Sequence, residues 1–431
     1  MFAKVISGTP YGVEAKLVEV QCDVGPGLPG FAIVGLAEKE VSEARERVRS
    51  ALRNAGLPFP GTRITANLAP ADLKKEGAGL DLALAVAVLV ASGELPGERA
   101  QGLAFYGELA LDGGLRPVRG TLAVALAARE AGLAGLVVPA EAAPEAALAE
   151  GLPAYPAADL SQVVAFLKGE LELAPAPRVL PEAPPPEWLD LRLVRGQEHA
   201  RRALEIAAAG GHNLLMVGPP GGGKSLLARC LPGILPPLSF DEALEVTRIY
   251  SVAGLLPPGR GLLRHRPFRA PHHTISYAGM VGGGHGVPTP GEITLAHHGV
   301  LFLDELPEFD RKVLEALRQP LEDRRISVVR AGVAVSFPAS FTLVGAMNPC
   351  PCGHLGDPLK PCRCRPHEIV RYRKRISGPF LDRIDLFVQL PRLTKEELLG
   401  DGRGEPSEAV RERVETAREV QRDRFGGPYN N

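Results

Sequence analysis

The sequence lacks an apolar run long enough to cross a bilayer. Its longest run, at residues 82–91, is followed by Ser92, Gly93 and Glu94, whereas a membrane-spanning helix needs about 20 apolar residues. The N-terminus also lacks the charged and then apolar pattern of a signal peptide. We therefore expect a cytoplasmic protein without a membrane partner.

An excess of charge of either sign is missing as well. The formal net charge is −1, so the charge of the whole molecule gives no argument for a nucleic-acid partner. Any such partner must be met by a local basic patch.

The length of 431 residues exceeds one ordinary core, and two or three domains are expected. A proline-rich stretch at 171–186 is typical of a stiff, extended linker. It separates a first domain at 1–170 from a second domain at 187–392, and residues 393–431 follow as a charged, helical segment.

Periodic patterns predict the elements of both domains. In the first domain, period-two stretches at 16–22 and 31–34 predict strands, and residues 41–55 and 79–91 predict helices. In the second, strand and helix patterns alternate, which favours an α/β fold with a parallel sheet.

The most informative motif is a phosphate loop that fills the pattern G-x-x-x-x-G-K-[ST]. An apolar run precedes it and a helix-forming run follows it, which is the context that the motif requires. Glycines let the backbone N–H groups of such a loop surround a polyphosphate. We expect Lys224 to reach the outer phosphates of ATP and the Ser225 hydroxyl to bind Mg²⁺. The loop residues are Gly218, Pro219, Pro220, Gly221, Gly222, Gly223, Lys224 and Ser225.

Two further strand patterns end in polar residues. The apolar run at 300–303 ends in Asp304 and Glu305. We expect Asp304 to hold Mg²⁺ and Glu305 to orient or deprotonate the attacking water. The run at 341–347 ends in Asn348, which we expect to bond the γ-phosphate or the water.

These motifs, followed by Leu-Asp-Arg-Ile-Asp at 381–385, resemble an AAA+ ATPase in type and order. An insert at 270–284 and a predicted hairpin around Ala331 and Gly332 resemble the magnesium-chelatase and replicative-helicase branch. Nearly the whole chain resembles the ComM/YifB family of magnesium-chelatase-like proteins. The resemblance also implies a helical lid, of which residues 393–431 would be only the start.

By this resemblance Arg383 is an arginine finger, which would reach the ATP of a neighbouring subunit. A shared site implies a ring, and we expect a hexamer assembled with ATP. The alternative is that Arg383 only pairs with Asp382 or Asp385.

Three blocks of the first domain, at 74–81, 107–111 and 115–120, resemble the Lon-type protease domain. That family uses a serine nucleophile activated by a lysine. Aligned without gaps, these positions fall on Gly79 and Leu122, which offer neither group. We therefore expect an inactive, α+β Lon-protease-like scaffold that serves assembly or substrate contact.

Four cysteines form two C-x-C pairs. In a cytosolic protein such a cluster more often binds metal than forms disulfides, and four thiolates suit tetrahedral Zn²⁺. We expect a structural zinc site that orders the loop after Asn348; the alternative is four reduced thiols. The cysteines are Cys350, Cys352, Cys362 and Cys364.

Basic residues of the hairpin and of the stretch at 363–375 are the candidates for nucleic-acid contact; the hairpin contributes Arg324, Arg325 and Arg330. Repeated in a ring, they would line a positive channel that binds DNA without sequence preference. Alternatively, they pair with acids or serve the subunit interface.

The resemblance implies a ring-forming DNA motor driven by ATP. It would act as a helicase or in branch migration during natural transformation and recombination, on single-stranded and branched DNA. Two alternatives stay open: a magnesium-chelatase-type motor subunit that remodels a partner enzyme, and a non-enzymatic scaffold.

Overall fold

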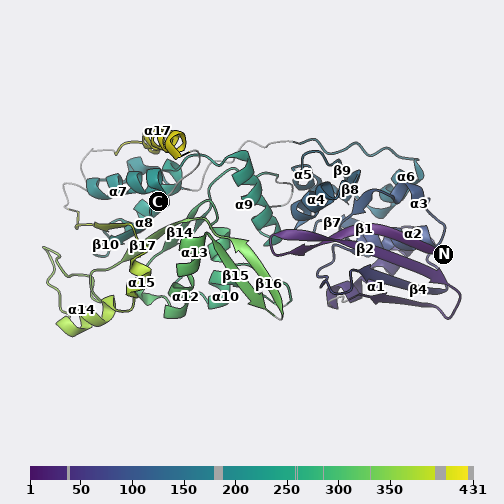
Figure 1. The fold of residues 1–431 in the computed structure, drawn as a ribbon, viewed down its shortest axis with the longest axis horizontal. Coiled ribbons are helices and arrows are strands. Elements are labelled where there is room, and N and C mark those ends of the chain that lie inside the picture. Colours follow the sequence, from purple (N-terminus) through teal and green to yellow (C-terminus); the bar gives the residue numbers. More distant parts are fainter. Residues whose placement is uncertain are drawn as a thin grey trace.

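The computed structural model describes residues 1–35, 39–178, 188–257, 259, 261–284, 286–330, 332–393 and 404–425. Two modules lie side by side along the long axis, and each is built on its own large sheet (Figure 1). We call residues 1–178 the N-terminal module and residues 188–425 the C-terminal module. The expected linker at 171–186 falls partly outside the described residues, and its described part, 171–178, contains no helix or strand.

A mixed sheet organises the N-terminal module, with the spatial order β3-β4-β2-β1-β5-β8-β9. Its strands are β1 (Phe2–Tyr11), β2 (Glu14–Gly25), β3 (Gly30–Val34), β4 (Arg63–Ala69), β5 (Leu103–Phe105), β8 (Gly135–Pro139) and β9 (Ala154–Ala157), beside a short separate pair, β6 (Glu108–Leu109) and β7 (Leu115–Arg116). β1 and β2 pair in antiparallel fashion, whereas β5, β8 and β9 continue the sheet in parallel. The strands predicted at 16–22 and 31–34 lie within β2 and β3, and both predictions are confirmed.

The helices of this module cover its sheet. They are α1 (Lys39–Asn54), α2 (Asp81–Ala91), α3 (Gly97–Ala100), α4 (Thr121–Glu130), α5 (Ala143–Ala146) and α6 (Leu160–Lys168), with a short 3-10 turn, η1 (Ala140–Ala142). α2 is buried at every position except Val90, because its alanine, leucine and valine side chains leave it no polar face. The helices predicted at 41–55 and 79–91 correspond to α1 and α2.

A parallel sheet organises the C-terminal module, with the spatial order β11-β14-β17-β10-β18. Its strands are β10 (Leu214–Val217), β11 (Phe268–Arg269), β14 (Val300–Leu303), β17 (Thr342–Met347) and β18 (Leu386–Gln389), and all neighbouring pairs are parallel. β14 and β17 are buried throughout, which explains their unbroken apolar sequences. β10 comes first in the chain but lies between the last two strands, and ligands bind at such reversals of strand order. The predicted α/β fold is confirmed.

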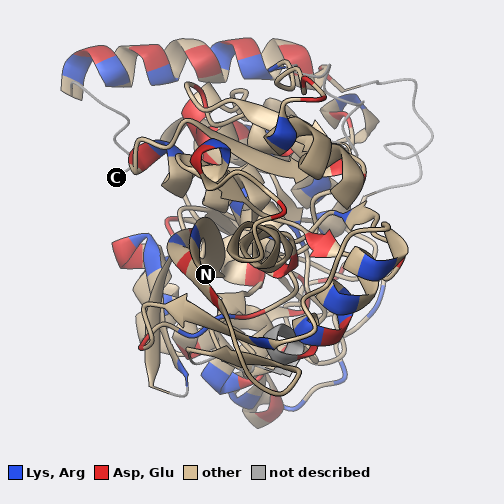
Figure 2. Cartoon of the chain, turned by 90° about the vertical axis from the view of Figure 1, so that its right-hand side faces the viewer, with Lys and Arg blue, Asp and Glu red and all other residues tan. Residues whose placement is uncertain are grey.

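Helices pack on both faces of this sheet. Outside the two appendages described below, the described helices of this module are α7 (Glu198–Gly210), α8 (Lys224–Ile234), α9 (Phe240–Val252), α12 (Arg311–Ala316), α13 (Arg318–Asp323), α14 (Pro366–Arg373), α15 (Gly378–Leu381) and α17 (Ser407–Phe425), with the turns η2 (Leu191–Leu193) and η3 (Leu306–Glu308). α17 lies across α7 and α8 and buries Val410 and Val414. Its outer surface carries many acidic and basic residues (Figure 2).

Two appendages extend from the C-terminal module. The first, which we call the insert, spans residues 270–296 and contains α10 (Tyr277–Val281), β12 (Gly282–Gly283), β13 (Thr289–Pro290) and α11 (Glu292–Leu295). The second is a hairpin of β15 (Arg325–Arg330) and β16 (Val333–Pro338), paired antiparallel from Arg325 opposite Pro338 to Arg330 opposite Val333. The predicted hairpin is therefore confirmed.

The two modules share buried contacts. The turn between β1 and β2 places Val13 in the core of the C-terminal module. Gly12 in this turn has a φ of 68°, and a Cβ there would collide with Val335 on the inner face of the hairpin. The N-terminal module therefore braces the hairpin from behind.

A second junction joins α4 to α9. The Ser251 hydroxyl accepts the Gly120 N–H at 3.0 Å and donates to Glu145 Oε1 at 2.5 Å. α9 thus contributes to the packing of both modules.

Among the described helices, none is both long and apolar enough to cross a membrane.

Candidate nucleotide site and its surroundings

The phosphate loop connects β10 to the first residue of α8. Gly221 and Gly223 have φ values of 77° and 86°, in the left-handed region that glycine enters without steric cost. The Gly218 N–H donates to the Met347 carbonyl at 3.2 Å. The loop is thereby tied to the end of the neighbouring strand β17, as the strand–loop–helix pattern predicts.

The ammonium group of Lys224 lies inside this loop. It donates to the carbonyls of Gly218 at 2.7 Å and Pro219 at 2.9 Å, and to Asn348 Oδ1 at 3.2 Å. Lys224 is 9 % exposed, and burial lowers its pKa, although nearby carboxylates oppose that shift. The loop therefore presents a positive charge at the place where phosphate oxygens are expected, with Asn348 beside it.

Ser225 and Asp304 meet at the rim of the loop. The Ser225 hydroxyl donates to Asp304 Oδ2 at 2.7 Å, and the other carboxylate oxygen accepts the Glu305 N–H at 2.9 Å. A hydroxyl and a carboxylate are the hard oxygen ligands that Mg²⁺ prefers. This donor set fits Mg²⁺.

Glu305 follows β14 in an unusual conformation. Its φ is 52°, a left-handed region that costs a residue with a side chain about 1–2 kcal/mol. Its carboxylate is 58 % exposed, and Oε2 lies 3.4 Å from Nδ1 of His273. The Glu305 side chain is thus exposed to solvent on one side and faces the His273 imidazole on the other.

His273 was not assigned to this site by the sequence analysis. It follows β11 closely, and β11 pairs with β14, whose end carries the two acids. The carboxyl ends of parallel neighbours meet at one sheet edge, which is the signal that would have placed it.

Arg383 lies at the amino ends of the strands of the same sheet, opposite the carboxyl ends that carry the phosphate loop. Its carbonyl accepts the Asn213 Nδ2–H at 2.9 Å, and Asn213 directly precedes β10. The 4 residues of β10 lie between Asn213 and the phosphate loop. At a rise of about 3.3 Å per strand residue, the loop begins more than about 13 Å from Asn213. Arg383 therefore does not reach its own phosphate loop.

The guanidinium group of Arg383 is held within the module. Nη2 donates to Glu322, and Nη1 donates to the Pro379 carbonyl at 2.8 Å. Among the described residues, its ion pair is thus with Glu322 rather than with Asp382 or Asp385. Asp385 instead accepts the Asn213 N–H at 2.7 Å.

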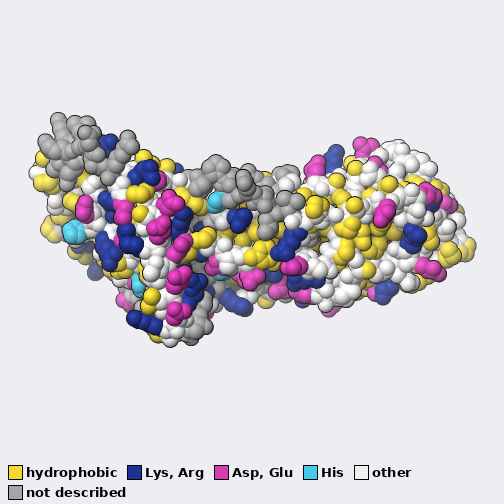
Figure 3. All heavy atoms as spheres, turned by 90° about the horizontal axis from the view of Figure 1, so that it is seen from above, with side chains coloured by type: hydrophobic (Ala, Val, Ile, Leu, Met, Phe, Trp, Pro, Cys, Tyr) yellow, Lys and Arg dark blue, Asp and Glu magenta, His cyan; other side chains and the backbone are white. Residues whose placement is uncertain are grey.

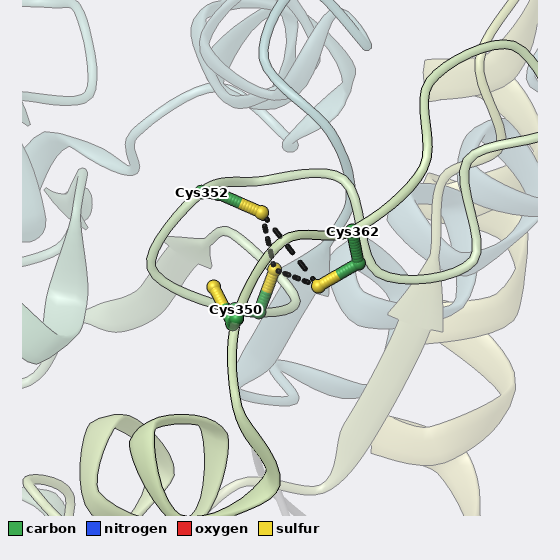
Figure 4. A group of neighbouring side chains, drawn as sticks. Cys350, Cys352 and Cys362 are labelled. Carbon is green, nitrogen blue, oxygen red and sulfur yellow. Dashed lines mark hydrogen bonds between the residues drawn. The ribbon is translucent and has the colours of Figure 1, made fainter.

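The four cysteines of the C-x-C pairs come together as predicted. Their ligand atoms all lie within 4.8 Å of one another, and the Sγ separations among Cys350, Cys352 and Cys362 are 3.5–3.6 Å (Figure 4). Sulfurs around a tetrahedral zinc at about 2.3 Å would be about 3.8 Å apart, whereas a disulfide requires about 2.05 Å. The pKa of the Cys352 thiol is lowered to about 6, chiefly because it accepts a hydrogen bond from the Arg363 backbone. The cluster fits Zn²⁺.

The loop that carries these cysteines lies against the phosphate loop. Gly353 has a φ of 81°, and a Cβ there would approach Pro220 Cδ to 2.7 Å. Asp357, farther along, accepts from Arg392 at 2.7 Å and contacts His354 Nδ1 at 3.1 Å. The cysteine loop therefore packs closely against the phosphate loop at Pro220.

A second group of possible ligands consists of Glu245, His297 and His298. Glu245 Oε2 lies 2.9 Å from Nε2 of each histidine. The Ser340 N–H donates to His297 Nδ1 at 3.0 Å, so the proton of the neutral ring lies on Nε2. A protonated nitrogen does not bind metal, and we interpret this group as a hydrogen-bond network that ties α9 to the start of β14.

The candidate DNA-contacting residues Arg324, Arg325 and Arg330 are all exposed. At the end of β15, Val329 is 68 % exposed, and Gly283 of the insert lies next to Arg330. The hairpin and the insert thus form one continuous surface.

The basic stretch at 363–375 is partly engaged in internal contacts. Arg375 Nη1 pairs with Glu308 at 2.6 Å, and Arg373 donates to the Pro349 carbonyl at 3.3 Å. On the face of the molecule seen in Figure 3, acidic and basic side chains are interspersed. Two cations of this stretch, Arg373 and Arg375, are therefore already engaged within the module.

The positions that align with a protease dyad hold no catalytic group. A Cβ on Gly79 would collide with the ring of Tyr106, and Leu122 is fully buried. A cavity of about 570 Å³ lies here between the modules, lined by residues that include Glu76 and Arg119. Glu76 Oε1 accepts the Val287 N–H of the insert at 2.5 Å, so the insert docks at this cavity.

The fold and the nucleotide site define an AAA+ ATPase module preceded by a mixed α/β module. Comparison with protein-family models agrees with this class. Residues 190–398 match "Magnesium chelatase, subunit ChlI", and residues 18–142 match "Subunit ChlI of Mg-chelatase".

Relatives of known sequence extend over nearly the whole chain. The competence protein ComM of Haemophilus influenzae is 48 % identical, over 98 % of this chain and 83 % of its own length. The protein YifB of Salmonella typhimurium is 47 % identical, over 95 % of this chain and 80 % of its own length. The chain belongs to the ComM/YifB family of magnesium-chelatase-like AAA+ ATPases.

A more distant match supports the protease-like character of the fold. Lon protease 2 of Bacillus subtilis is 27 % identical over 36 % of this chain and 32 % of its own length. The predicted combination of an AAA+ domain with a Lon-protease-like domain is consistent with this match.

Proposed function

We propose that the protein is a ring-forming DNA motor driven by ATP hydrolysis, which acts as a helicase or in branch migration during natural transformation and recombination. Single-stranded and branched DNA are its substrates, and it works in the cytoplasm. One observation carries the proposal: the phosphate site lies at the carboxyl ends of the strands of the sheet, and Arg383 lies at their amino ends. A protomer arranged in this way completes its neighbour's site, not its own.

The chemistry is assigned to residues around the phosphate loop. Lys224 holds the β- and γ-phosphates, and Asn348 positions the γ-phosphate and the attacking water. Glu305 orients this water and takes its proton as the bond from the water oxygen to phosphorus forms and the bond to ADP breaks. Ser225 and Asp304 would hold Mg²⁺, which neutralises phosphate charge when bound.

Arg383 acts on the ATP of the next subunit. A heterologous, head-to-tail interface closes into a ring, and we propose a hexamer. The guanidinium group then stabilises charge on the transferred phosphoryl group in the transition state.

DNA contact is assigned to the hairpin together with the insert. Arg324, Arg325 and Arg330 are exposed there, and ring symmetry would repeat them around a central channel. Contacts of this kind bind phosphates without reading sequence and weaken as salt rises.

Zinc is assigned a structural role in the cysteine loop. Four thiolates would hold it, and the contact of Gly353 with Pro220 supports an effect on the phosphate loop. The N-terminal module is assigned the role of a brace for the hairpin and insert, without peptidase activity.

A second candidate function is a magnesium-chelatase-type motor that remodels a partner enzyme, because both matching family models are named for that subunit. The two functions differ in what stimulates ATP hydrolysis. A DNA motor responds to DNA, whereas a chelatase motor responds only to its partner protein.

The test has two parts. ATP turnover is measured with and without single-stranded DNA and a synthetic four-way junction, and strand exchange is then followed on that junction. We expect DNA to stimulate turnover and exchange to require ATP. Binding of DNA with neither effect would refute the motor proposal.

A further inference from the structure

The ion pair between Arg383 and Glu322 connects the proposed DNA surface to the proposed trans-acting arginine. Glu322 lies on α13, and only Arg324 separates the end of α13 from the first residue of the hairpin, Arg325. Arg324 has a φ of 54° and its carbonyl accepts the Ala339 N–H at 2.8 Å, which closes the base of the hairpin. A displacement of the hairpin therefore moves α13.

The surroundings of Arg383 favour movement of its side chain over movement of its backbone. The Asn213 side chain and backbone hold the Arg383 carbonyl and Asp385, and Asn213 Oδ1 accepts the Leu343 N–H at 2.9 Å. These bonds fix the backbone to β10 and β17. The guanidinium group, in contrast, lines an open cavity of about 310 Å³ together with Glu322.

The partners of the guanidinium group leave it incompletely satisfied. The side chain of Arg383 is 24 % exposed and that of Glu322 is 53 % exposed. Nε is buried and, among the described residues, has no hydrogen-bond partner. The exposed Glu322 carboxylate thus holds the Arg383 guanidinium group only weakly. In the ring, a phosphate of the neighbouring subunit's ATP would offer this group more and stronger hydrogen bonds.

We propose that Glu322 is a positioning residue that holds Arg383 away from the neighbouring subunit's ATP until DNA engages the hairpin. This inference rests on the proposed function, because it assumes that Arg383 acts in trans. DNA bound at the hairpin shifts α13, separates Glu322 from Arg383 and frees the guanidinium group to extend across the interface. One subunit's contact with DNA thereby controls hydrolysis in the next.

The size of the effect follows from the exposure of the pair. An exposed ion pair biases a two-state equilibrium by up to about fivefold. Glu322→Gln should therefore raise kcat without DNA by about two- to fivefold and leave kcat with DNA unchanged. The stimulation by DNA falls by the same factor, while KM for ATP stays constant because the finger acts in the transition state.

The experiment measures kcat and KM for ATP on assembled rings, with and without a single-stranded oligonucleotide. Glu315→Gln is the matched control: Glu315 pairs with Arg318 at 3.0 Å on the adjoining helices and bonds Ser377, and among the described residues it forms no ion pair with Arg383. It should behave as the unmodified protein. Glu322→Asp keeps the charge and withdraws the carboxylate, and should give an intermediate stimulation.

The outcomes separate the two proposals. Unchanged or lowered DNA-free turnover in both Glu322 variants, with rings and thermal stability intact, would overturn the positioning role. Arg383→Ala should abolish turnover on its own and in combination with Glu322→Gln. Persistent turnover in Arg383→Ala would overturn the shared site itself, whatever the Glu322 variants do.

Discussion

Arg383 and Glu305 belong to different halves of each proposed site, and two inactive variants should therefore restore one another. Glu305→Gln removes the group that activates water but leaves Arg383 intact. Arg383→Ala removes the finger but leaves the phosphate loop and its acids intact. An interface between the two variants contains a complete site if the Arg383→Ala protomer supplies the nucleotide and the Glu305→Gln protomer supplies the arginine.

The expected magnitude follows from the geometry and from the ring. Each variant alone should lose at least about 10³-fold in kcat, the lower range for an arginine finger, which corresponds to about 4 kcal/mol of transition-state stabilisation. In a random one-to-one mixture, about one interface in four of a head-to-tail ring is complete. Turnover should then recover to about a quarter of the unmodified rate if sites act independently, a rise of more than about a hundredfold.

The assay is ATP turnover by the two variants, separately and after co-assembly with nucleotide, with ring formation checked by light scattering. Lys224→Ala mixed with Glu305→Gln is the control, because both changes damage the same half of the site and cannot restore one another. A mixture of Arg383→Ala and Glu305→Gln that turns over no faster than the separate variants would show that Arg383 acts within its own protomer or not at all.

Three further predictions follow from contacts around the site. Removal of zinc by a chelator, or Cys362→Ser, should weaken ATP binding as measured by a fluorescent nucleotide, because the cysteine loop supports Pro220; unchanged affinity with the metal demonstrably absent would contradict that support. Gly12→Ala should destabilise the C-terminal module by about 2–4 kcal/mol through backbone strain and overpacking, and it should speed amide exchange in the hairpin. Gly56→Ala is the control, because Gly56 has the same φ of 68° but no atom within 4 Å of an added Cβ, and it should show only the cost of the strain. Arg325→Ala should reduce the dependence of DNA affinity on salt by about one unit of slope without reducing DNA-free turnover; an unchanged slope would remove this residue from the DNA surface.

Much of the nucleotide site was predictable because its signals are local. The phosphate loop, the acids after β14 and the amide after β17 each follow a recognisable strand, and parallel strands gather their carboxyl ends at one edge. The cysteine cluster was predictable for a similar reason, since its spacing permits few arrangements. The roles of these residues stay proposals, as do the domain limits.

The sequence could not indicate contacts between distant segments. Glu322 belongs to no motif and contacts Arg383 only because α13 carries it there, whereas His273 could have been placed only from the pairing of β11 with β14. The brace at Gly12 joins segments more than 300 residues apart along the chain, and no periodic pattern signals such packing. His297 and His298 also belong to no motif, and only the structure reveals that both contact the Glu245 carboxylate.

The segment at 171–178 is the only described covalent path towards the second module, yet the halves also interlock through the turn at Gly12 and through α9. A nick in that segment would therefore leave two pieces that still migrate as one particle. The sequences of the two modules are constrained together, because any module that replaced one of them would have to rebuild both buried junctions.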